Sequence, residues 1–596
     1  MCGIFGYVRA EVGGAGDAAG IVLRGLKKLE YRGYDSWGVA VAHDGRAAVE
    51  RRVGKIGEAV TTLPPSAIGL GHTRWATHGG VTEPNAHPHL DCTGRLALIH
   101  NGMVSNYREL RDGLARGAHR FTSETDTEVI AHLLEECLAR TPSGRERLAG
   151  AVMATFRQLD GLNAIAVLDV ESGEIAAAKN GSPLVLGWSA GGHLLASDPS
   201  ALLDHTREVT FVDDGQAALI GRGAIRLFNV ETGAEVSPEI AHVSWDAAAT
   251  ELSGYPDFMT KEIREQPAVL RRIAADADDH VRRLAALLRE ARDVFVVGCG
   301  TAGHAALAAQ YLLGRIARRR LTYVAGSEFA YLGDFAGEGA LVLALSQSGE
   351  TIDVIDAVRA ARRRGARIAA LVNVEGSTLW RLADCAIPLA AGPERCVLAT
   401  KSFTAKLAVL LLTAHELIGQ LETGRALVRG AADEIERLLT DERRDLIRQI
   451  ADAIYERAHL FVIGRGPSYP SALEAALKVK EVSYVHAEGF AGGELKHGVI
   501  ALVEPGTPCL VLAPGDDTHA DIISGAMQMK ARGAVIIGIA AAPSEAFDLH
   551  IPVADLGPAT AIANAVPAQL LGYYMALLRG HDPDKPRNLA KSVTVK

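Results

Sequence analysis

The second half of the chain repeats itself, and this repeat limits the possible folds more than any other feature. Three apolar runs recur, in the same order, as the pairs 294–300 with 460–466, 341–344 with 510–513 and 365–368 with 533–536. The offsets are 166 residues (298 to 464), 169 (341 to 510) and 168 (366 to 534). Three ordered matches at nearly constant spacing indicate a duplicated structural unit. Strand, glycine turn and long helix alternate here, which is typical of a parallel sheet with helices on both faces.

The repeat, together with a change in the pattern of strand-like and helix-like runs, divides the chain into regions. Residues 2–240 alternate short strand-like runs with turns, such as those at 38–42 and 163–168, which favours a sheet-rich α+β domain. We expect the following further regions: a linker and connecting helix at 241–283, two doubly wound α/β subdomains at 284–424 and 450–586, and a C-terminal tail at 587–596. Doubly wound subdomains that pack together leave a crevice where ligands bind. The tail is expected to enter that crevice.

Composition excludes several classes of protein. The chain has 596 residues, of which 48% are hydrophobic and 22% charged, as in globular domains with large cores. A formal charge of −9 gives no electrostatic surface for nucleic acid. The N-terminus lacks a basic segment followed by an apolar one, and no uninterrupted apolar run reaches the roughly 18 residues of a membrane span. We expect a cytoplasmic protein without nucleic-acid or membrane partners.

The cysteines point to one position. There are seven, none in a Cys-x-x-Cys pair, so no zinc or redox centre is expected. Cys2 differs because removal of Met1 would place a free α-amine, with a pKa of about 7.7 to 8.0, beside its thiol. On position alone, an ordinary second residue is the commoner explanation. The hypothesis that Cys2 is a nucleophile is supported by five segments downstream: residues 30–36, 72–79, 85–89, 100–102 and 124–128.

These segments supply what the hydrolysis of free glutamine requires. Asn101-Gly102, after an apolar strand, offers a side-chain amide and a backbone N–H for an oxyanion. The fork of Arg74 suits an α-carboxylate, and Asp126 suits an ammonium group. Asp126 is explained equally well as the N-cap of a helix that begins near Val129.

In order and in residues, these segments resemble the N-terminal-nucleophile glutaminase domain of class II amidotransferases. The resemblance implies that Cys2 is the nucleophile and that Asn101 and Gly102 form the oxyanion hole. It further implies a set of pocket residues: Arg74 and Asp126 on the glutamine backbone, Thr77 and His78 lining the pocket, and Trp75 at the mouth of an ammonia path. His87 and His89 are expected to be structural.

A second chemical site is indicated by the loop Ser346-Gln347-Ser348-Gly349-Glu350-Thr351, between an apolar strand and a helix. Hydroxyls, glycine and free N–H groups at a helix N-terminus suit a phosphate dianion. A serine N-cap explains Ser348 without any ligand. The turn at Gly298-Cys299-Gly300-Thr301 strengthens the phosphate interpretation, because both loops follow carboxyl ends of strands.

Three further segments carry groups for sugar chemistry. Lys478 and Glu481 lie three residues apart in a helical stretch and share one face. His497 lies in a glycine-bounded segment, and Lys591 lies in the tail. Converting a ketose to an amino sugar requires a ring opener, an amine that forms an imine and a base that moves a proton, which suit His, Lys and Glu. Without this context, Lys478 and Glu481 would be an ordinary surface ion pair.

These motifs are similar to those of the isomerase domain of glutamine–fructose-6-phosphate aminotransferases. The resemblance implies roles for nine residues: Thr301, Ser346, Gln347, Ser348 and Thr351 bind the sugar phosphate, His497 opens the ring, Lys591 forms the Schiff base, Glu481 moves the proton and Lys478 assists. It implies no metal, nicotinamide or pyridoxal phosphate cofactor. Glutamine and a hexose phosphate are the expected ligands, and a homodimer is expected.

Two positions depart from the family pattern. Ala302 and Ala399 stand where the family commonly has serine. A lost hydrogen bond is worth about 0.5 to 1.5 kcal/mol, which alters selectivity more than chemistry. The alternatives are the same chemistry on another keto-sugar phosphate and, from a different class, a sugar-phosphate sensor. A sensor would not need Glu481, His497 and Lys591 together with a glutaminase.

Overall fold

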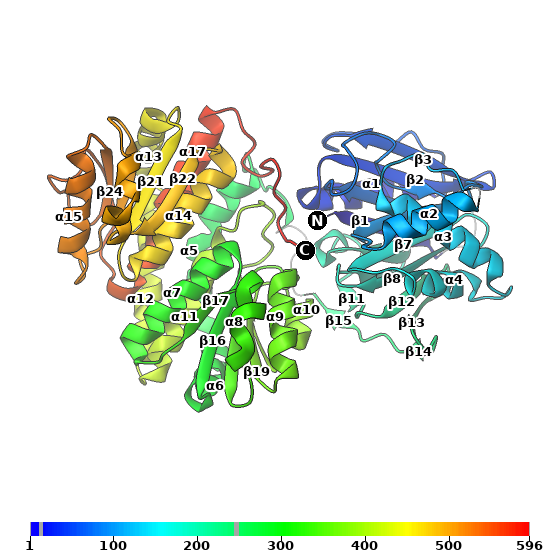
Figure 1. Ribbon diagram of the computed structural model, residues 1–596, viewed down its shortest axis with the longest axis horizontal. Coiled ribbons are helices and arrows are strands. Elements are labelled where there is room, and N and C mark those ends of the chain that lie inside the picture. The colour runs from blue at the N-terminus through cyan, green and yellow to red at the C-terminus, as the bar shows by residue number, and fades with distance from the viewer. Residues whose placement is uncertain (1, 11–15, 118, 244–249, 595–596) are drawn as a thin grey trace. The chain divides into compact units, whose positions relative to one another are not determined.

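The protein divides into two compact units (Figure 1). The computed structural model describes residues 2–10, 16–117, 119–243 and 250–594. Of these described residues, the N-terminal unit contains those up to Glu251, Gly376–Thr378 and 590–594, and the C-terminal unit contains Leu252–Glu375 and Leu379–Leu589. The last segment of the chain therefore groups with the first domain.

The N-terminal unit is built on two antiparallel sheets. In spatial order the first contains β15 (Ala241–His242), β11 (Glu208–Phe211), β9 (Val185–Ser189), β10 (Gly192–Ala196), β1 (Gly3–Arg9), β4 (Ile68–Arg74), β2 (Ser36–His43) and β3 (Arg46–Val53). The second contains β14 (Glu235–Val236), β13 (Ile225–Asn229), β12 (Gln216–Ile220), β8 (Glu174–Asn180), β7 (Asn163–Asp169), β6 (Leu96–Gly102) and β5 (His89–Leu90). Its helices are α1 (Ala18–Leu29), α2 (Tyr107–Arg116), α3 (Asp126–Arg140) and α4 (Arg147–Phe156).

Alternating side chains explain the layers of this unit. Along β1, Ile4 and Val8 join a core shared with Ile99 of the second sheet, whereas Phe5 and Tyr7 pack under α1. Successive strand residues point to opposite faces, so an apolar residue at every position buries the strand on both sides. Helices α3 and α4 cover the outer face of the second sheet. The predicted sheet-rich α+β domain is confirmed as two sheets between helical layers.

The C-terminal unit contains two parallel five-stranded sheets with identical topology. In spatial order the first is β17 (Thr322–Ala325), β16 (Asp293–Gly298), β18 (Ala340–Ser346), β19 (Arg367–Val372) and β20 (Cys385–Pro388). The second is β22 (His486–Ala491), β21 (His459–Gly464), β23 (Pro508–Leu512), β24 (Val535–Ala540) and β25 (Leu549–Pro552). The predicted pair of doubly wound α/β subdomains is confirmed.

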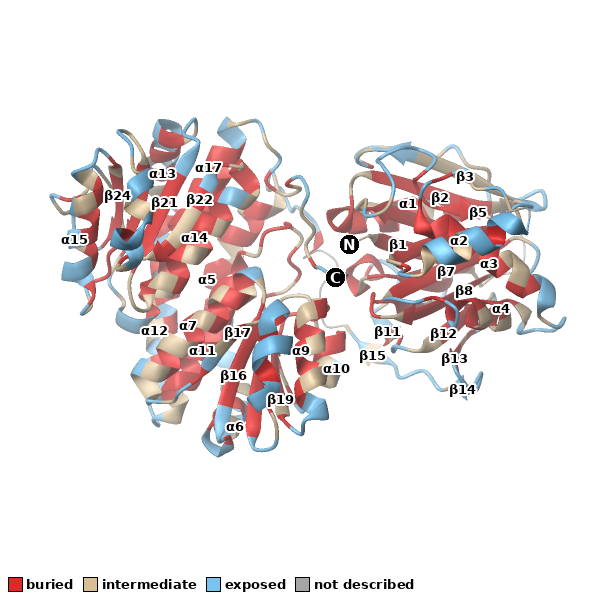
Figure 2. Cartoon of the chain, in the orientation of Figure 1, coloured by how far each residue is buried: buried red, intermediate tan, exposed pale blue. Residues whose placement is uncertain are grey.

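Helices cover both faces of these sheets. They are α5 (Phe258–Asp276), α6 (Asp278–Glu290), α7 (Gly300–Ala317), α8 (Phe329–Leu332), α9 (Ile352–Arg363), α10 (Thr378–Leu382), α11 (Lys401–Leu417), α12 (Leu421–Leu438), α13 (Asp441–Ile454), α14 (Ser468–Ser483), α15 (His519–Lys530), α16 (Thr560–Ala563) and α17 (Ala565–Leu578). One apolar core includes Val296 and Leu343 of the first sheet and Val462 and Leu510 of the second. Figure 2 shows the inner strands β16, β19, β21 and β24 as mostly buried. The two subdomains are thus held together by a shared interior.

Two helical stretches contribute to the core of the C-terminal unit. The region expected to be a linker and connecting helix contains α5, which contributes Met259 and Leu270 to the shared core. The stretch Gly557–Leu578 is long and apolar enough to cross a membrane by length and composition, yet 78% of its apolar window is buried within the protein. Such burial is typical of a core helix.

Candidate active sites

Cys2 lies at the start of a central strand of the first sheet. Gly3 N–H donates to Thr73 Oγ1 at 3.0 Å, and Ile4 N–H donates to Ser197 Oγ at 3.0 Å, so the backbone beside the thiol is fixed. A Cβ at Gly3 would approach Thr73 Oγ1 to 2.6 Å and Leu29 Cβ to 2.7 Å. Close packing beside the thiol therefore requires glycine at position 3.

The Cys2 sulfur lies in a buried, hydrogen-bonded position. Trp75 N–H donates to Sγ across 3.2 Å. Burial raises the pKa of the thiol, and the Trp75 N–H and the nearby Arg74 charge oppose that shift only in part. A thiol in this setting requires a base to become a nucleophile.

Asn101 is held beside Cys2 by a neutral histidine. Its Nδ2 donates to the carbonyl oxygen of Cys2 at 2.9 Å, and its Oδ1 lies 2.9 Å from His72 Nε2. The other neighbour of that nitrogen is the His100 carbonyl, at 3.0 Å, so Nε2 carries the proton. Burial lowers the pKa of His72 to about 3, which keeps the ring neutral. The Asn101 amide is thereby oriented with its N–H groups toward Cys2.

Arg74 and Asp126 both belong to the polar lining of the pocket beside Cys2. Arg74 donates to the carbonyl oxygens of His78, Gly79 and Gly80 at 2.5, 3.2 and 3.0 Å. Asp126 Oδ2 accepts from Val104 N–H at 2.9 Å. The alternative of Asp126 as an N-cap is wrong, because Thr125 caps α3 and accepts from Glu128 N–H. Asp126 is instead the first helical residue, with its carboxylate buried at the positive end of the helix dipole.

A single pocket collects the predicted glutamine-site residues. All eight line it: Cys2, Arg74, Trp75, Thr77, His78, Asn101, Gly102 and Asp126. The structure adds His87 from the loop before β5, His100 from β6, Thr127 from α3 and Thr594 from the C-terminal segment. His87 Nε2 and His100 Nδ1 lie 2.8 and 3.1 Å from Thr127 Oγ1. His87 and His89 are both buried, as residues that support the pocket wall would be.

The sugar-site loops lie at the switch point of the first parallel sheet. Its spatial order corresponds to chain order 2-1-3-4-5, so the connections diverge between β16 and β18. Ligands of open α/β sheets bind at the carboxyl ends of the strands at such a point. Thr301 follows β16, and the 346–351 loop follows β18.

The 346–351 loop is shaped by its own serines. Ser346 Oγ accepts from Gly349 N–H at 2.9 Å, and Ser348 Oγ accepts from Glu350 N–H at 3.1 Å. The alternative of Ser348 as a helix cap is wrong, because Thr351 occupies the N-cap of α9 and makes no side-chain cap bond. The loop therefore presents a helix N-terminus beside several hydroxyl groups.

Lys478 is the centre of a buried charged network on α14. Its Nζ donates to Thr301 Oγ1 at 3.0 Å and lies 3.3 Å from Glu474 and 2.8 Å from Glu481 carboxylate oxygens. The side chains of Lys478 and Glu474 are 1% and 2% exposed, so this is no surface ion pair. Burial alone would lower the pKa of Lys478, but the two carboxylates raise it above its ordinary value. The cation is thus permanently charged next to Thr301.

Two members of this network were missed in the sequence. Glu474 also accepts from Thr301 Oγ1 at 3.0 Å and lies 2.8 Å from His304 Nδ1. Although burial would raise it, Lys478, His304 and Thr301 hold the pKa of Glu474 below its ordinary value. The available signal was the spacing of four between Glu474 and Lys478, which places both on one helix face.

Comparisons with known proteins cover the whole chain. A model of the glutamine amidotransferase domain matches residues 72–204, and a model of the SIS domain matches residues 287–416 and 453–579. A Pyrococcus horikoshii protein named glutamine–fructose-6-phosphate aminotransferase (isomerizing) is 40% identical over 609 residues, covering 100% of both chains. A protein of the same name from Symbiobacterium thermophilum is 42% identical over 627 residues, with the same coverage. The chain belongs to this family.

A solved structure agrees with the aminotransferase assignment. The C-terminal domain of glucosamine-fructose-6-phosphate aminotransferase from Francisella tularensis is 29% identical and superimposes with a TM-score of 0.52. The match covers 56% of this chain and 100% of that domain.

The remaining residues of the aminotransferase pattern lie on other segments. His497 is exposed, at the end of the short helix η6 (Glu494–His497). Lys591 belongs to the C-terminal segment that groups with the N-terminal unit. Ala399 accepts from Lys478 Nζ through its backbone carbonyl at 3.3 Å, a bond that alanine and serine make equally. The roles of His497 and Lys591 stay predictions.

Proposed function

We propose that this protein hydrolyses L-glutamine at Cys2 and transfers the ammonia to D-fructose 6-phosphate, giving D-glucosamine 6-phosphate and L-glutamate. The observation that carries the proposal is full-length similarity to proteins named for this activity. The pocket lined by eight predicted glutamine-site residues supports the first half-reaction. The Thr301–Lys478–Glu481 network supports the second.

In the first half-reaction, the Cys2 thiolate attacks the side-chain amide carbon of glutamine. Because burial raises the pKa of the thiol, a base must take its proton. The α-amine that removal of Met1 would leave on Cys2 is the base in this mechanism. Met1 itself lies outside the described residues. The amine returns the proton to the departing ammonia, and water then releases glutamate from the thioester. Asn101 and Gly102 stabilise the tetrahedral oxyanion, and losing one such donor costs about 10²- to 10³-fold in rate.

The glutamine main chain is recognised by charge. Arg74 binds the α-carboxylate and Asp126 the ammonium group, while Thr77 and His78 line the pocket and Trp75 stands at the ammonia exit. The Arg74 fork already orders the carbonyl groups of residues 78–80, which couples substrate binding to the shape of that loop.

In the second half-reaction, Thr301 and the loop residues Ser346, Gln347, Ser348 and Thr351 bind the sugar phosphate. His497 opens the ring, and the Lys591 amine condenses with the C2 carbonyl, releasing water. Ammonia then replaces Lys591 at C2, and Glu481 carries a proton from C1 to C2 to give the amino aldose. Lys478, held 2.8 Å from Glu481, positions that carboxylate through the ion pair.

Incubation with glutamine and a panel of ketose phosphates tests the overall proposal, with products identified by mass and NMR. Glucosamine 6-phosphate as the main product is expected. A different amino sugar would favour the alternative substrate, which the alanines at positions 302 and 399 suggest. Binding without any product would favour a sensor.

Borohydride tests the role of Lys591. Reduction in the presence of fructose 6-phosphate should leave a sugar-phosphate adduct on the C-terminal peptide of the wild-type protein. Lys591→Arg should keep the charge but form no adduct and make no product, because a guanidinium forms no imine. An adduct on another lysine would contradict the assignment.

The expected cytoplasmic location and homodimeric state stay predictions. Cell fractionation tests the first, and light scattering of the purified protein tests the second.

A further inference from the structure

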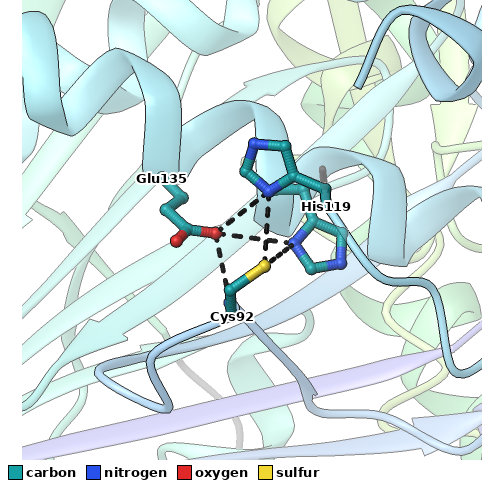
Figure 3. Close-up of side chains that lie close together, drawn as sticks. Cys92, His119 and Glu135 are labelled. Atoms are coloured by element: carbon teal, nitrogen blue, oxygen red, sulfur yellow. Dashed lines mark hydrogen bonds and ion pairs between the residues drawn. The ribbon is translucent and has the colours of Figure 1, made fainter. Parts of the chain in front are cut away.

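Four potential metal ligands converge on the N-terminal unit, outside the lining of the Cys2 pocket. Cys92 lies in the turn between β5 and β6, His119 lies before α3, and His132 and Glu135 lie on α3. Figure 3 shows Cys92, His119 and Glu135 pointing toward a common centre. One donor atom from each of the four residues lies within 4.8 Å of the other three.

The distances between donor atoms are those of a tetrahedral zinc site. Zinc bonds of about 2.0 to 2.2 Å to nitrogen and oxygen, and about 2.3 Å to sulfur, give N···O edges of roughly 3.3 to 3.5 Å and S···N edges of roughly 3.5 Å. Cys92 Sγ lies 3.3 Å from His119 Nδ1 and 3.5 Å from His132 Nδ1. Glu135 Oε2 lies 3.3 and 3.6 Å from the same two nitrogens.

Both imidazoles also have a carboxylate near their second ring nitrogen, His119 at closer range than His132. His119 Nε2 lies 3.4 Å from Glu136 Oε1, and His132 Nε2 lies 3.9 Å from Glu128 Oε1. A ligating histidine commonly donates its second N–H to a carboxylate, which fixes the tautomer and makes the ligand more basic. In both rings Nδ1 faces the centre and Nε2 faces a carboxylate, so the two rings are oriented alike.

We propose that Cys92, His119, His132 and Glu135 bind one Zn²⁺ ion in a structural site. One thiolate and two imidazoles favour zinc over magnesium or calcium, which prefer all-oxygen ligands. Four protein ligands close the coordination shell and leave no position for a substrate. Cys92 is exposed and His119 partly so, which gives an ion access from solvent.

The ion would join three segments around the helix that carries Asp126. His132 and Glu135 lie on the second and third turns of α3, whereas Cys92 and His119 belong to the segments that precede β6 and α3. Glu128, whose carboxylate lies 3.9 Å from His132 Nε2, accepts from the backbone N–H groups of Thr122 and Ser123 at 2.7 Å. Zinc therefore stabilises the start of α3, one wall of the glutamine pocket, without touching glutamine.

Metal content and cobalt spectroscopy of the full-length protein test this proposal. Protein loaded with Zn²⁺ and dialysed against metal-free buffer should retain about one zinc per chain. Co²⁺ in its place should give the intense visible bands of tetrahedral coordination and a near-ultraviolet thiolate-to-cobalt band. Cys92→Ala should lose the thiolate band and the stoichiometric zinc. Glu136→Gln should keep the spectrum but bind zinc about 10-fold more weakly, as the loss of an outer partner predicts.

Cys137→Ala is the matched control, because it removes a different thiol, on α3, and leaves all four proposed ligands in place. It should retain zinc and the cobalt spectrum. Zinc should also protect Cys92, but no other cysteine, from iodoacetamide in peptide mapping, and should raise the melting temperature of wild type and not of Cys92→Ala. Wild-type protein that retains no zinc, or a Cys92→Ala variant with unchanged metal content and melting shift, would overturn the proposal.

Discussion

The two candidate active sites differ in how far apart their residues lie along the chain. The glutamine pocket draws its eight predicted residues from the first 126 positions, and one unit brings all of them together. The predicted sugar site draws on residues from Thr301 to Lys591, and the structure joins Thr301, Lys478 and Glu481 of that set through a hydrogen bond and an ion pair. A site formed by neighbouring strands is fixed by one domain's fold, whereas the second site requires several segments to be placed correctly.

Cys2→Ala separates the two sites most strongly. Glutamine hydrolysis should fall by about 10⁴-fold or more, because no other group on the described pocket wall replaces the nucleophile. Isomerisation of fructose 6-phosphate should continue at close to the wild-type rate. Cys385→Ala, in the other unit, serves as a control with both activities intact. Loss of both activities in Cys2→Ala would show that the sites do not act independently.

The first site was predictable because its chemistry lies within short contiguous motifs. The duplicated sheets were predictable as well, because their apolar strands recur at a nearly constant offset. Contacts between distant positions were not. Glu474 and His304 meet only when α14 packs near α7, and Thr594 reaches the glutamine pocket from the end of the chain.

The cluster of Cys92, His119, His132 and Glu135 shows the same limit. A Cys-x-x-Cys pair indicates zinc ligands that lie close together in the sequence, and this chain has no such pair. Here the ligands come from three segments, and their convergence depends on how α3 packs against the second sheet.

Lys478→Met tests the buried network of the second site. Removing the cation leaves Glu474 charged and buried, which should cost about 3 to 5 kcal/mol in the free energy of unfolding of the C-terminal unit. Adding Glu474→Gln should recover much of that stability without restoring synthesis. Lys480→Met, exposed on the same helix, should change stability by less than about 0.5 kcal/mol. Equal effects at the two lysines, measured by denaturant unfolding, would contradict a buried charged centre.

Acid should destabilise the N-terminal unit before the C-terminal unit. Burial lowers the pKa values of His72 and His89 to about 3, whereas an unfolded histidine has a pKa near 6.5. Between these values the unfolded chain binds more protons, so stability falls as pH decreases, by about 1.4 kcal/mol per pH unit for each ring. In the Lys478 network the depressed pKa belongs to Glu474, whose stabilising effect is lost only below the unfolded glutamate pKa of about 4.3.

Calorimetry between about pH 7 and pH 5 measures this difference, with glutamine and fructose 6-phosphate used to assign the transitions. The glutamine-sensitive transition should move to lower temperature first, and His89→Gln should reduce its pH slope. Earlier loss of the sugar-sensitive transition would contradict the assignment of neutral buried histidines.

The smallest effect is expected at the two alanines. Ala302→Ser with Ala399→Ser should leave fructose 6-phosphate the preferred substrate and change kcat/KM by less than about 10-fold, near 1.4 kcal/mol. The control is the same pair of substitutions assayed with competing ketose phosphates. If the wild-type protein instead prefers another ketose phosphate, and the double variant loses that preference, then that sugar and not fructose 6-phosphate is the substrate.

Transfer of labelled nitrogen tests most directly whether the two sites act on one ammonia molecule. Wild-type protein given amide-¹⁵N glutamine, unlabelled ammonium and fructose 6-phosphate should produce glucosamine 6-phosphate that carries the ¹⁵N label at C2, as mass spectrometry and NMR would detect. Cys2→Ala should produce none. Release of labelled ammonia with no labelled amino sugar, or a label found on a different sugar phosphate, would contradict the account.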